Sequence, residues 1–147
     1  MTLLKEKALA PHPAWHYESG IKLAAVDVRR NHPRALDPAI KSSNLLNNIL
    51  AVREAHARGA EEPVLLNQEG FLAEGASTTV FLVRGGAVAT PPLSAGILGG
   101  ITREVVLELL PTLGIPCREE PLRLADLLGA DEAFITSTTR EVVPVAR

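Results

Sequence analysis

Cysteine is nearly absent from this sequence, because Cys117 is its only one. A single cysteine excludes an intrachain disulfide and fits a reducing compartment, so we expect a cytoplasmic protein. No apolar run approaches the roughly 20 residues that a membrane span needs. Residues 1–10 also lack the apolar core of a signal peptide. We therefore expect no association with a membrane.

Neither positive nor negative charge is in large excess in the sequence. The 147 residues have a formal net charge of −2. The only basic cluster consists of Arg29, Arg30 and Arg34, and we interpret it as a solvated loop. Nucleic-acid binding needs clustered positive charge, so we expect no nucleic-acid partner.

The motifs of several enzyme classes are missing. The sequence has no G-x-S-x-G elbow, and its glycine-rich stretch lacks the Walker lysine. His12 and His16 have an interval that suits a metal, but they flank Pro13 in an irregular segment. No second pair of ligands accompanies them, so we expect no metal site.

The patterns that are present predict one domain with mixed α and β content. Hydrophobic residues make up 46% of the chain, enough for a real core. Apolar spacing predicts helices over 43–58, 102–110 and 122–128. Strands are predicted over 21–28, 63–67, 71–74, 78–84, 87–90, 115–119 and 132–136, with a hairpin at Gly85 and Gly86. These local pairs favour antiparallel pairing over a regular β-α-β alternation.

The two ends of the chain are less regular. Residues 1–20 are poorly patterned, and Pro11 and Pro13 close any helix over 3–10. We interpret 1–20 as a linker or the remnant of a missing N-terminal domain, and 21–147 as the folded domain. The chain stops directly after the apolar run 142–145, which leads us to expect a domain truncated at its C-terminus.

Two segments could bind a carbonyl compound or an anion. Lys41 precedes the predicted helix 43–58, where the positive helix terminus helps to lower a lysine pKa and favours Schiff-base formation. An exposed surface lysine is the alternative. Gly99 and Gly100 precede Ile101 and Thr102 at another helix start. The free N–H groups there could hold a phosphate, or Thr102 could be an ordinary N-cap.

Two further positions have the same ambiguity. Ser137, Thr138 and Thr139 follow a predicted buried strand directly, and their hydroxyl and N–H groups could form an anion nest or an ordinary polar turn. Glu74 ends a predicted strand before Gly75. Its carboxylate could pair with a protonated ring nitrogen or lie on the surface.

The order of these segments along the chain is far more specific than any one of them. Ile40-Lys41-Ser42-Ser43-Asn44-Leu45-Leu46, Glu74-Gly75-Ala76-Ser77-Thr78, Gly100-Ile101-Thr102-Arg103 and Thr136-Ser137-Thr138-Thr139-Arg140-Glu141 follow one another at set intervals. This succession resembles the class IV (fold-type IV) pyridoxal-phosphate (PLP) aminotransferases, and D-amino-acid and branched-chain aminotransferases most closely. The resemblance covers residues 22–145.

The resemblance implies a fold and a set of roles. It implies a curved, largely antiparallel sheet with outer helices, amino acid and 2-oxo acid substrates, and a homodimer. Lys41 would form the Schiff base with PLP and transfer the substrate proton, and Glu74 would hold the pyridine nitrogen protonated. Phosphate and ring contacts would come from Ser77, Leu98, Ile101, Thr102, Ser137 and Thr138, and substrate contacts from Thr138 and Thr139.

Alternatives remain within this resemblance. Leu45 beside Asn44 suits D-amino-acid aminotransferases, whereas residues 47–51 and 94–98 also suit branched-chain relatives. An aminodeoxychorismate lyase is a third reading. Family members are about twice as long, so we expect this chain to form one wall of the active site, with weakened PLP binding and poor transamination by itself. A non-catalytic remnant that binds PLP or dimerises is the alternative to an enzyme.

Overall fold

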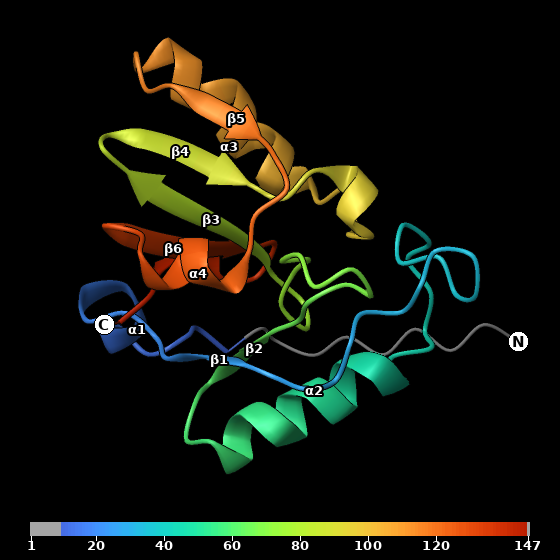
Figure 1. Cartoon of the computed structure of the whole chain (residues 1–147). Helices are drawn as coiled ribbons and strands as arrows, with labels where there is room; N and C mark the ends of the chain where they lie inside the picture. Colours follow the sequence, from blue (N-terminus) through green and yellow to red (C-terminus); the bar gives the residue numbers. More distant parts are fainter. Residues whose placement is uncertain (1–9, 147) are drawn as a thin grey trace, which may run out of the picture.

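A five-stranded sheet forms the centre of the molecule (Figure 1). The computed structural model describes residues 10–146. The strands lie in the order β5-β4-β3-β6-β7, with β4 and β5 parallel and the other neighbours antiparallel. Their bounds are β3 (Thr79–Arg84), β4 (Ala87–Thr90), β5 (Cys117–Glu119), β6 (Glu132–Ser137) and β7 (Glu141–Pro144).

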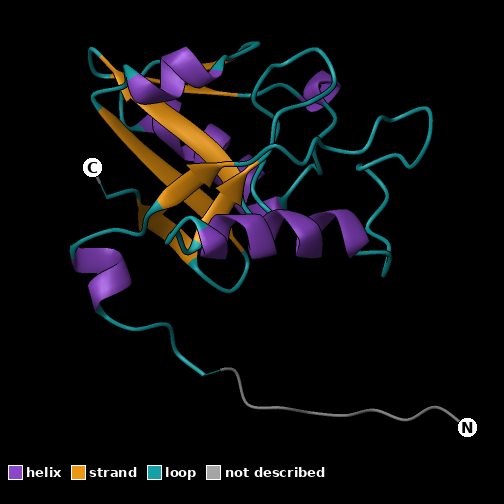
Figure 2. Cartoon of the chain, turned by 60° about the horizontal axis from the view of Figure 1, so that its bottom comes forward, coloured by secondary structure: helices purple, strands orange, loops and turns teal. Residues whose placement is uncertain are grey.

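A second, smaller sheet consists of two parallel strands, β1 (Leu23–Ala25) and β2 (Glu62–Val64). The long helix α2 (Leu46–Ala57) connects them and contacts both strands. Figure 2 shows α2 as the longest helix on its side of the molecule. The remaining helical segments are α1 (Trp15–Glu18), the 3-10 turn η1 (Leu93–Ala95), α3 (Ile101–Thr112) and α4 (Leu124–Leu128).

Side chains that alternate along β3 build a core on each face of the central sheet. Phe81 faces α3, where it lies in one cluster with Val88 and Leu110 and stacks on Phe134 at a centroid distance of 4.8 Å. Its neighbours Val80 and Leu82 face the other way, in a cluster that includes Val64 of β2 and Leu122 before α4. The central sheet is therefore buried from both sides.

The predicted fold class, a mixed α/β domain with a largely antiparallel sheet, is confirmed. The hairpin at Gly85 and Gly86 joins β3 to β4 as predicted. The predicted pairing of 63–67 with 71–74 is confirmed around an antiparallel bridge between Leu66 and Leu72, with backbone hydrogen bonds between 65–67 and 71–74. β2, at the start of the first segment, also pairs in parallel with β1, which the sequence did not predict.

The large apolar side chains whose spacing predicted α2 are mostly exposed and do not form its buried face. The small residues Ala51 and Ala55 are the buried residues of this helix. Leu46, Ile49 and Leu50 are 63%, 54% and 41% exposed. Small residues let a helix approach a sheet closely, and the larger side chains then lie on the open side. This leaves a contiguous exposed apolar surface on α2.

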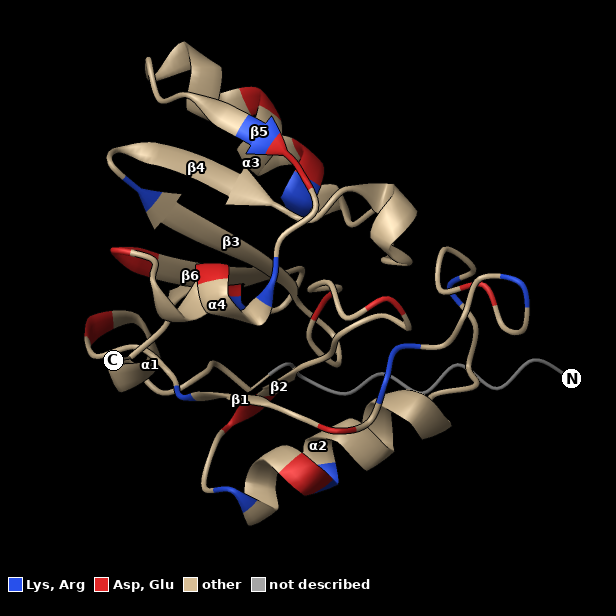
Figure 3. Ribbon diagram, in the orientation of Figure 1, with Lys and Arg blue, Asp and Glu red and all other residues tan. Residues whose placement is uncertain are grey.

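Residues 10–20 contact the central sheet. α1 contacts β7, and Gly20 lies so close to β7 that a Cβ atom there would come within 2.9 Å of the Pro144 carbonyl oxygen. Residues 3–9, where Pro11 and Pro13 would close any helix, lie outside the described residues, and the division between 1–20 and 21–147 stays a prediction. Within residues 10–146, no helix is long and apolar enough to cross a membrane. Charged residues are spread over helices, strands and loops (Figure 3).

Candidate active site

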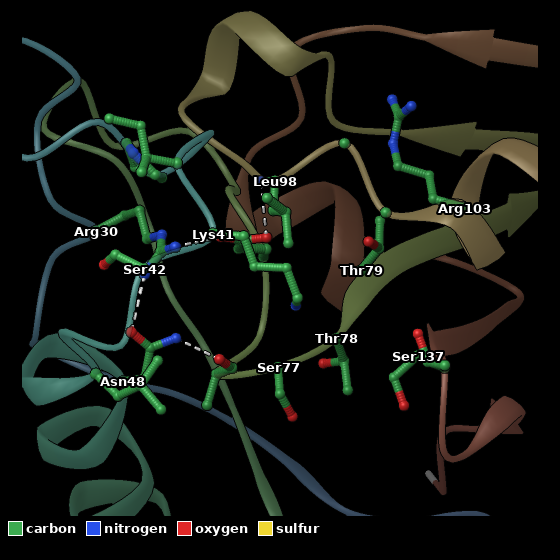
Figure 4. A pocket seen from close by; sticks show the side chains of 18 of the residues that line it. Arg30, Lys41, Ser42, Asn48, Ser77, Thr78, Thr79, Leu98, Arg103 and Ser137 are labelled. Carbon is green, nitrogen blue, oxygen red and sulfur yellow. Dashed lines mark hydrogen bonds and ion pairs between the residues drawn. The ribbon is translucent and has the colours of Figure 1, made fainter. Parts of the chain in front are cut away.

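A cavity of about 560 Å³ lies between the loop before α2, the loop after Glu74 and the start of α3 (Figure 4). The same cavity reaches the end of β6 and the turn that follows it. Eight of the nine predicted site residues line it: Lys41, Glu74, Ser77, Leu98, Ile101, Thr102, Ser137 and Thr138. Thr139 does not. Segments almost 100 residues apart in the sequence thus meet at one site.

Lys41 extends into this cavity beside Leu98 (Figure 4). It does not stand at a helix terminus as predicted, because α2 begins only at Leu46. The Asn44 N–H donates instead to the Ser42 hydroxyl at 3.2 Å, and this local turn competes with a helical start. Within residues 10–146, no hydrogen bond or ion pair holds the Lys41 amine. Lys41 is exposed and lines the cavity, and the helix-terminus explanation is wrong.

Glu74 is the buried acid of the site. Its Oε1 lies 2.6 Å from Arg30 Nη2, and its Oε2 accepts a hydrogen bond from the Leu98 N–H at 3.1 Å. Burial raises the pKa of Glu74 to about 7, while Arg30, the Leu98 N–H and the positive charge of Lys41 act in the opposite direction. A carboxyl group with this pKa exchanges its proton in the neutral range.

Arg30 corrects our interpretation of the basic cluster, because it is 7% exposed and not part of a solvated loop. Its Nη1 lies 3.3 Å from the side-chain oxygens of both Asn47 and Asn48. Asn48 in turn donates to the Ala76 carbonyl oxygen. Arg30 therefore links the first turn of α2 to Glu74. No feature of the sequence distinguished Arg30 from its neighbour Arg29.

The start of α3 offers free donors to the cavity. Gly100 is the extended N-cap, and its carbonyl oxygen accepts from the Glu104 N–H. The N–H groups of Ile101 and Thr102 therefore have no partner within the helix. No side-chain cap bond occurs at this terminus, so the reading of Thr102 as an N-cap is wrong. The positive end of the helix favours an anion at this position.

A buried hydroxyl lies near the same end of the cavity. Thr136 is 2% exposed, lines the cavity, and its Oγ1 has no hydrogen-bond partner within the described residues. Thr136 pairs with Thr79 across β6 and β3, and the Thr79 hydroxyl approaches Gly100. Orphaned buried polar atoms carry a cost unless they are satisfied. The donors here fit a phosphate, and Glu74 fits the basic nitrogen of an aromatic ring.

The turn after β6 is ordered by its own side chains. The Ser137 hydroxyl accepts a hydrogen bond from the Arg140 N–H at 3.2 Å, which is the ordinary polar turn that the sequence allowed. Ser137 and Thr138 nevertheless line the cavity. Thr139 is not among the residues that line the cavity, and its substrate role stays a prediction.

A domain that offers a lysine, a buried carboxyl group and an anion site to one cavity has the parts that a pyridoxal-phosphate enzyme needs. A family model described as amino-transferase class IV matches residues 3–147, and the chain belongs to this family. Class IV aminotransferases are PLP enzymes, as the resemblance in the sequence implied. The predicted family is therefore confirmed.

Individual relatives agree with this assignment. A Methanocaldococcus jannaschii protein provisionally named a branched-chain-amino-acid aminotransferase is 47% identical over 135 residues, which are 92% of this chain and 47% of that protein. The branched-chain aminotransferase structure from Thermoproteus uzoniensis with norvaline has a TM-score of 0.85 at 41% identity, covering 88% of this chain and 44% of the other. The PLP form of the Thermobaculum terrenum enzyme has a TM-score of 0.83 at 36% identity, covering 85% and 41%. This chain spans somewhat less than half the length of each of these three proteins.

Proposed function

We propose that this chain is the cofactor-binding part of a PLP-dependent aminotransferase that exchanges amino groups between amino acids and 2-oxo acids. The observation that carries this proposal is the convergence of Lys41, Glu74 and the start of α3 on one cavity. Membership of the class IV family supports the same conclusion.

Each of these groups has a task that its surroundings support. When bound, PLP supplies an aromatic ring that accepts electron density from the substrate α-carbon. Lys41 would attach the cofactor covalently and later carry the proton to and from that carbon. Glu74 would accept a hydrogen bond from the ring nitrogen, and the N–H groups of Ile101 and Thr102 would hold the phosphate. Thr138 would add its hydroxyl at the phosphate, and Leu98 would pack on the ring.

We propose branched-chain amino acids and their 2-oxo acids as the substrates. The support is the naming of the relatives, among them the Escherichia coli branched-chain-amino-acid aminotransferase at 36% identity over 129 residues. A D-amino-acid aminotransferase is a second candidate because Leu45, which resembles that group, lines the cavity. Comparing L-leucine and D-alanine as amino donors separates the two. An aminodeoxychorismate lyase has no such support from the relatives.

We also propose that the protein is a cytoplasmic homodimer. The exposed apolar surface of α2 supports association, because exposed patches of this kind mark contact surfaces. The single cysteine, Cys117, supports a reducing compartment.

The decisive experiment is to incubate the purified chain with PLP, reduce it with borohydride and locate the adduct by peptide mass. We expect the adduct mainly on Lys41 and its loss in Lys41→Ala. Lys22→Ala is the matched control, because Lys22 is also exposed but lies outside the cavity. Labelling spread evenly over the surface lysines would refute the proposal and favour a remnant that does no chemistry.

A further inference from the structure

Glu62 is a charged residue at the start of β2 that is 2% exposed and lies outside the group of cavity-lining residues. A carboxylate in this position needs several partners to offset its desolvation. The structure provides them from two segments that are distant in sequence. One is the loop that follows Glu74, and the other is the turn that follows β6.

One carboxylate oxygen of Glu62, Oε1, accepts hydrogen bonds from the loop that follows Glu74. Oε1 accepts hydrogen bonds from the N–H groups of Ala76 and Ser77, at 2.9 and 3.3 Å. It also accepts from the Thr78 hydroxyl at 3.0 Å. Three donors on one oxygen fix the path of the backbone that presents Ser77 and Thr78 to the cavity, where Figure 4 shows both side chains.

The other carboxylate oxygen of Glu62, Oε2, binds the turn that follows β6. Oε2 lies 3.0 Å from Arg140 Nη1, and both side chains are largely buried. The Arg140 N–H donates in turn to the Ser137 hydroxyl. Ser137 and Thr138 line the cavity, so Arg140 ties this wall to the same carboxylate that holds the loop.

The backbone leaves room for this arrangement at one position. A Cβ atom on Gly75 would lie 2.7 Å from Glu62 Oε1 and 2.1 Å from Thr78 Oγ1. Both distances are too short for real atoms, so any side chain at residue 75 would displace the carboxylate or the hydroxyl. The close approach of both Thr78 and Glu62 therefore favours glycine at this position.

We propose that Glu62 is a positioning residue whose single carboxylate holds the loop 75–78 and the turn 137–140 in a fixed relation beneath the cavity. Arg140 transmits this constraint to the turn. The consequence for PLP rests on the proposed function, whereas the coupling of the two segments does not. Glu62 itself touches no reacting group.

Two variants and one control test this proposal in the 15N-labelled full chain. Glu62→Gln keeps the side-chain shape, but it either turns an amide NH2 towards Arg140 or withdraws the acceptor from the loop. Arg140→Gln removes the cation from the other side and changes a side chain that is 21% exposed, so it keeps the test informative if Glu62→Gln does not fold. Glu61→Gln is the matched control, because Glu61 also accepts a backbone hydrogen bond, from the Lys22 N–H at 2.6 Å, yet lies outside this network.

We expect both variants to shift the NMR signals of residues 137–140 and to speed amide exchange at Ala76 and Ser77 by about tenfold, the effect of weakening a charge-assisted hydrogen bond. In the double variant, amide exchange at Ala76 and Ser77 should be little faster than in either single variant, because both substitutions break the same connection between the loop and the turn. The control should change neither segment. If Arg140→Gln left exchange at Ala76 and Ser77 unchanged, the coupling would be refuted.

A second readout separates positioning from plain stability. Well below the unfolding temperature, the Kd for PLP should rise roughly tenfold in Glu62→Gln and Arg140→Gln and stay unchanged in Glu61→Gln. An unchanged Kd in both variants, despite shifted signals, would overturn the positioning role. A wild-type chain that binds no PLP would refute the proposed function, and the exchange measurement would still decide the coupling.

Discussion

Arg30 Nη2 lies 2.6 Å from Glu74 Oε1, and the two side chains are each only 8% exposed. A buried ion pair of this kind costs desolvation on both sides, so its two members depend strongly on each other. Arg30 also reaches the side chains of Asn47 and Asn48 in α2. The acid that we assign to the ring nitrogen is thus connected through Arg30 to the first turn of α2.

Removing Arg30 should therefore destabilise the chain strongly. In Arg30→Met, Glu74 stays buried without its cation, and we expect the free energy of unfolding to fall by roughly 3–5 kcal/mol. Arg29→Met is the matched control, since Arg29 is exposed, and it should change stability by less than about 0.5 kcal/mol. Urea unfolding followed by circular dichroism measures both. Equal losses in the two variants would show that the pair does not stabilise the fold.

Glu74 also predicts how stability depends on pH. Its folded pKa of about 7 is above the ordinary value of 4.5 for a glutamate side chain, so between these pH values the unfolded chain releases the proton while the folded chain keeps it. The free energy of unfolding should therefore fall as pH rises from about 4.5 to about 7, by at most on the order of 3 kcal/mol, and then level off.

Glu74→Gln should remove this component, because glutamine does not titrate. Thermal unfolding of both proteins at intervals between pH 5 and pH 8 is the measurement. Glu69→Gln serves as the control, since Glu69 is exposed and its replacement should leave the slope intact. The assignment fails if the wild type and Glu74→Gln lose stability in parallel over this range.

The hydroxyl groups of the turn after β6 provide a third prediction. Thr138 lines the cavity and its neighbour Thr139 does not. Thr138→Val should weaken PLP binding about tenfold, the loss expected for one hydrogen bond to a charged group, while Thr139→Val should leave the Kd unchanged. Titration of the absorbance of bound PLP measures the Kd. If Thr139→Val bound PLP more weakly than Thr138→Val, the prediction would be wrong, because Thr139 and not Thr138 would then contact the phosphate.

The sequence predicts some of the residues that line this cavity and misses others for a physical reason. Lys41, Glu74 and Thr102 were proposed from the order of motifs that resembles the class IV aminotransferases, and all three line the cavity. Arg30 and Glu62 could not be found in this way, because each acquires its role from partners distant in the chain, such as Arg140 at a separation of 78 residues from Glu62. Local pattern contains no information on such partners.

The same distinction applies to the fold. The β3–β4 hairpin was predictable because two glycines in the turn join its strands. The parallel pairing of β4 with β5, and of β1 with β2, needs crossovers through α3 and α2. The exposure of the apolar side chains of α2 was not predictable, because hydrophobic spacing identifies an apolar face without identifying what covers it.

The exposed apolar face of α2 leads to the last prediction. Leu46 and Ile49 lie on one side of α2 and are 63% and 54% exposed, so water contacts apolar surface that association would bury. At about 25 cal/mol per Å² of buried apolar area, covering such side chains contributes favourably to a dimer. Ile49→Glu should therefore lower the apparent molecular mass in light scattering from dimer to monomer while leaving the circular dichroism spectrum unchanged.

Leu128→Glu on α4 is the control for this variant, because Leu128 is 78% exposed on another surface. Two outcomes would show that α2 is not the contact surface. One is a wild-type chain that is monomeric at every concentration tested, and the other is a dimer that dissociates in Leu128→Glu but not in Ile49→Glu.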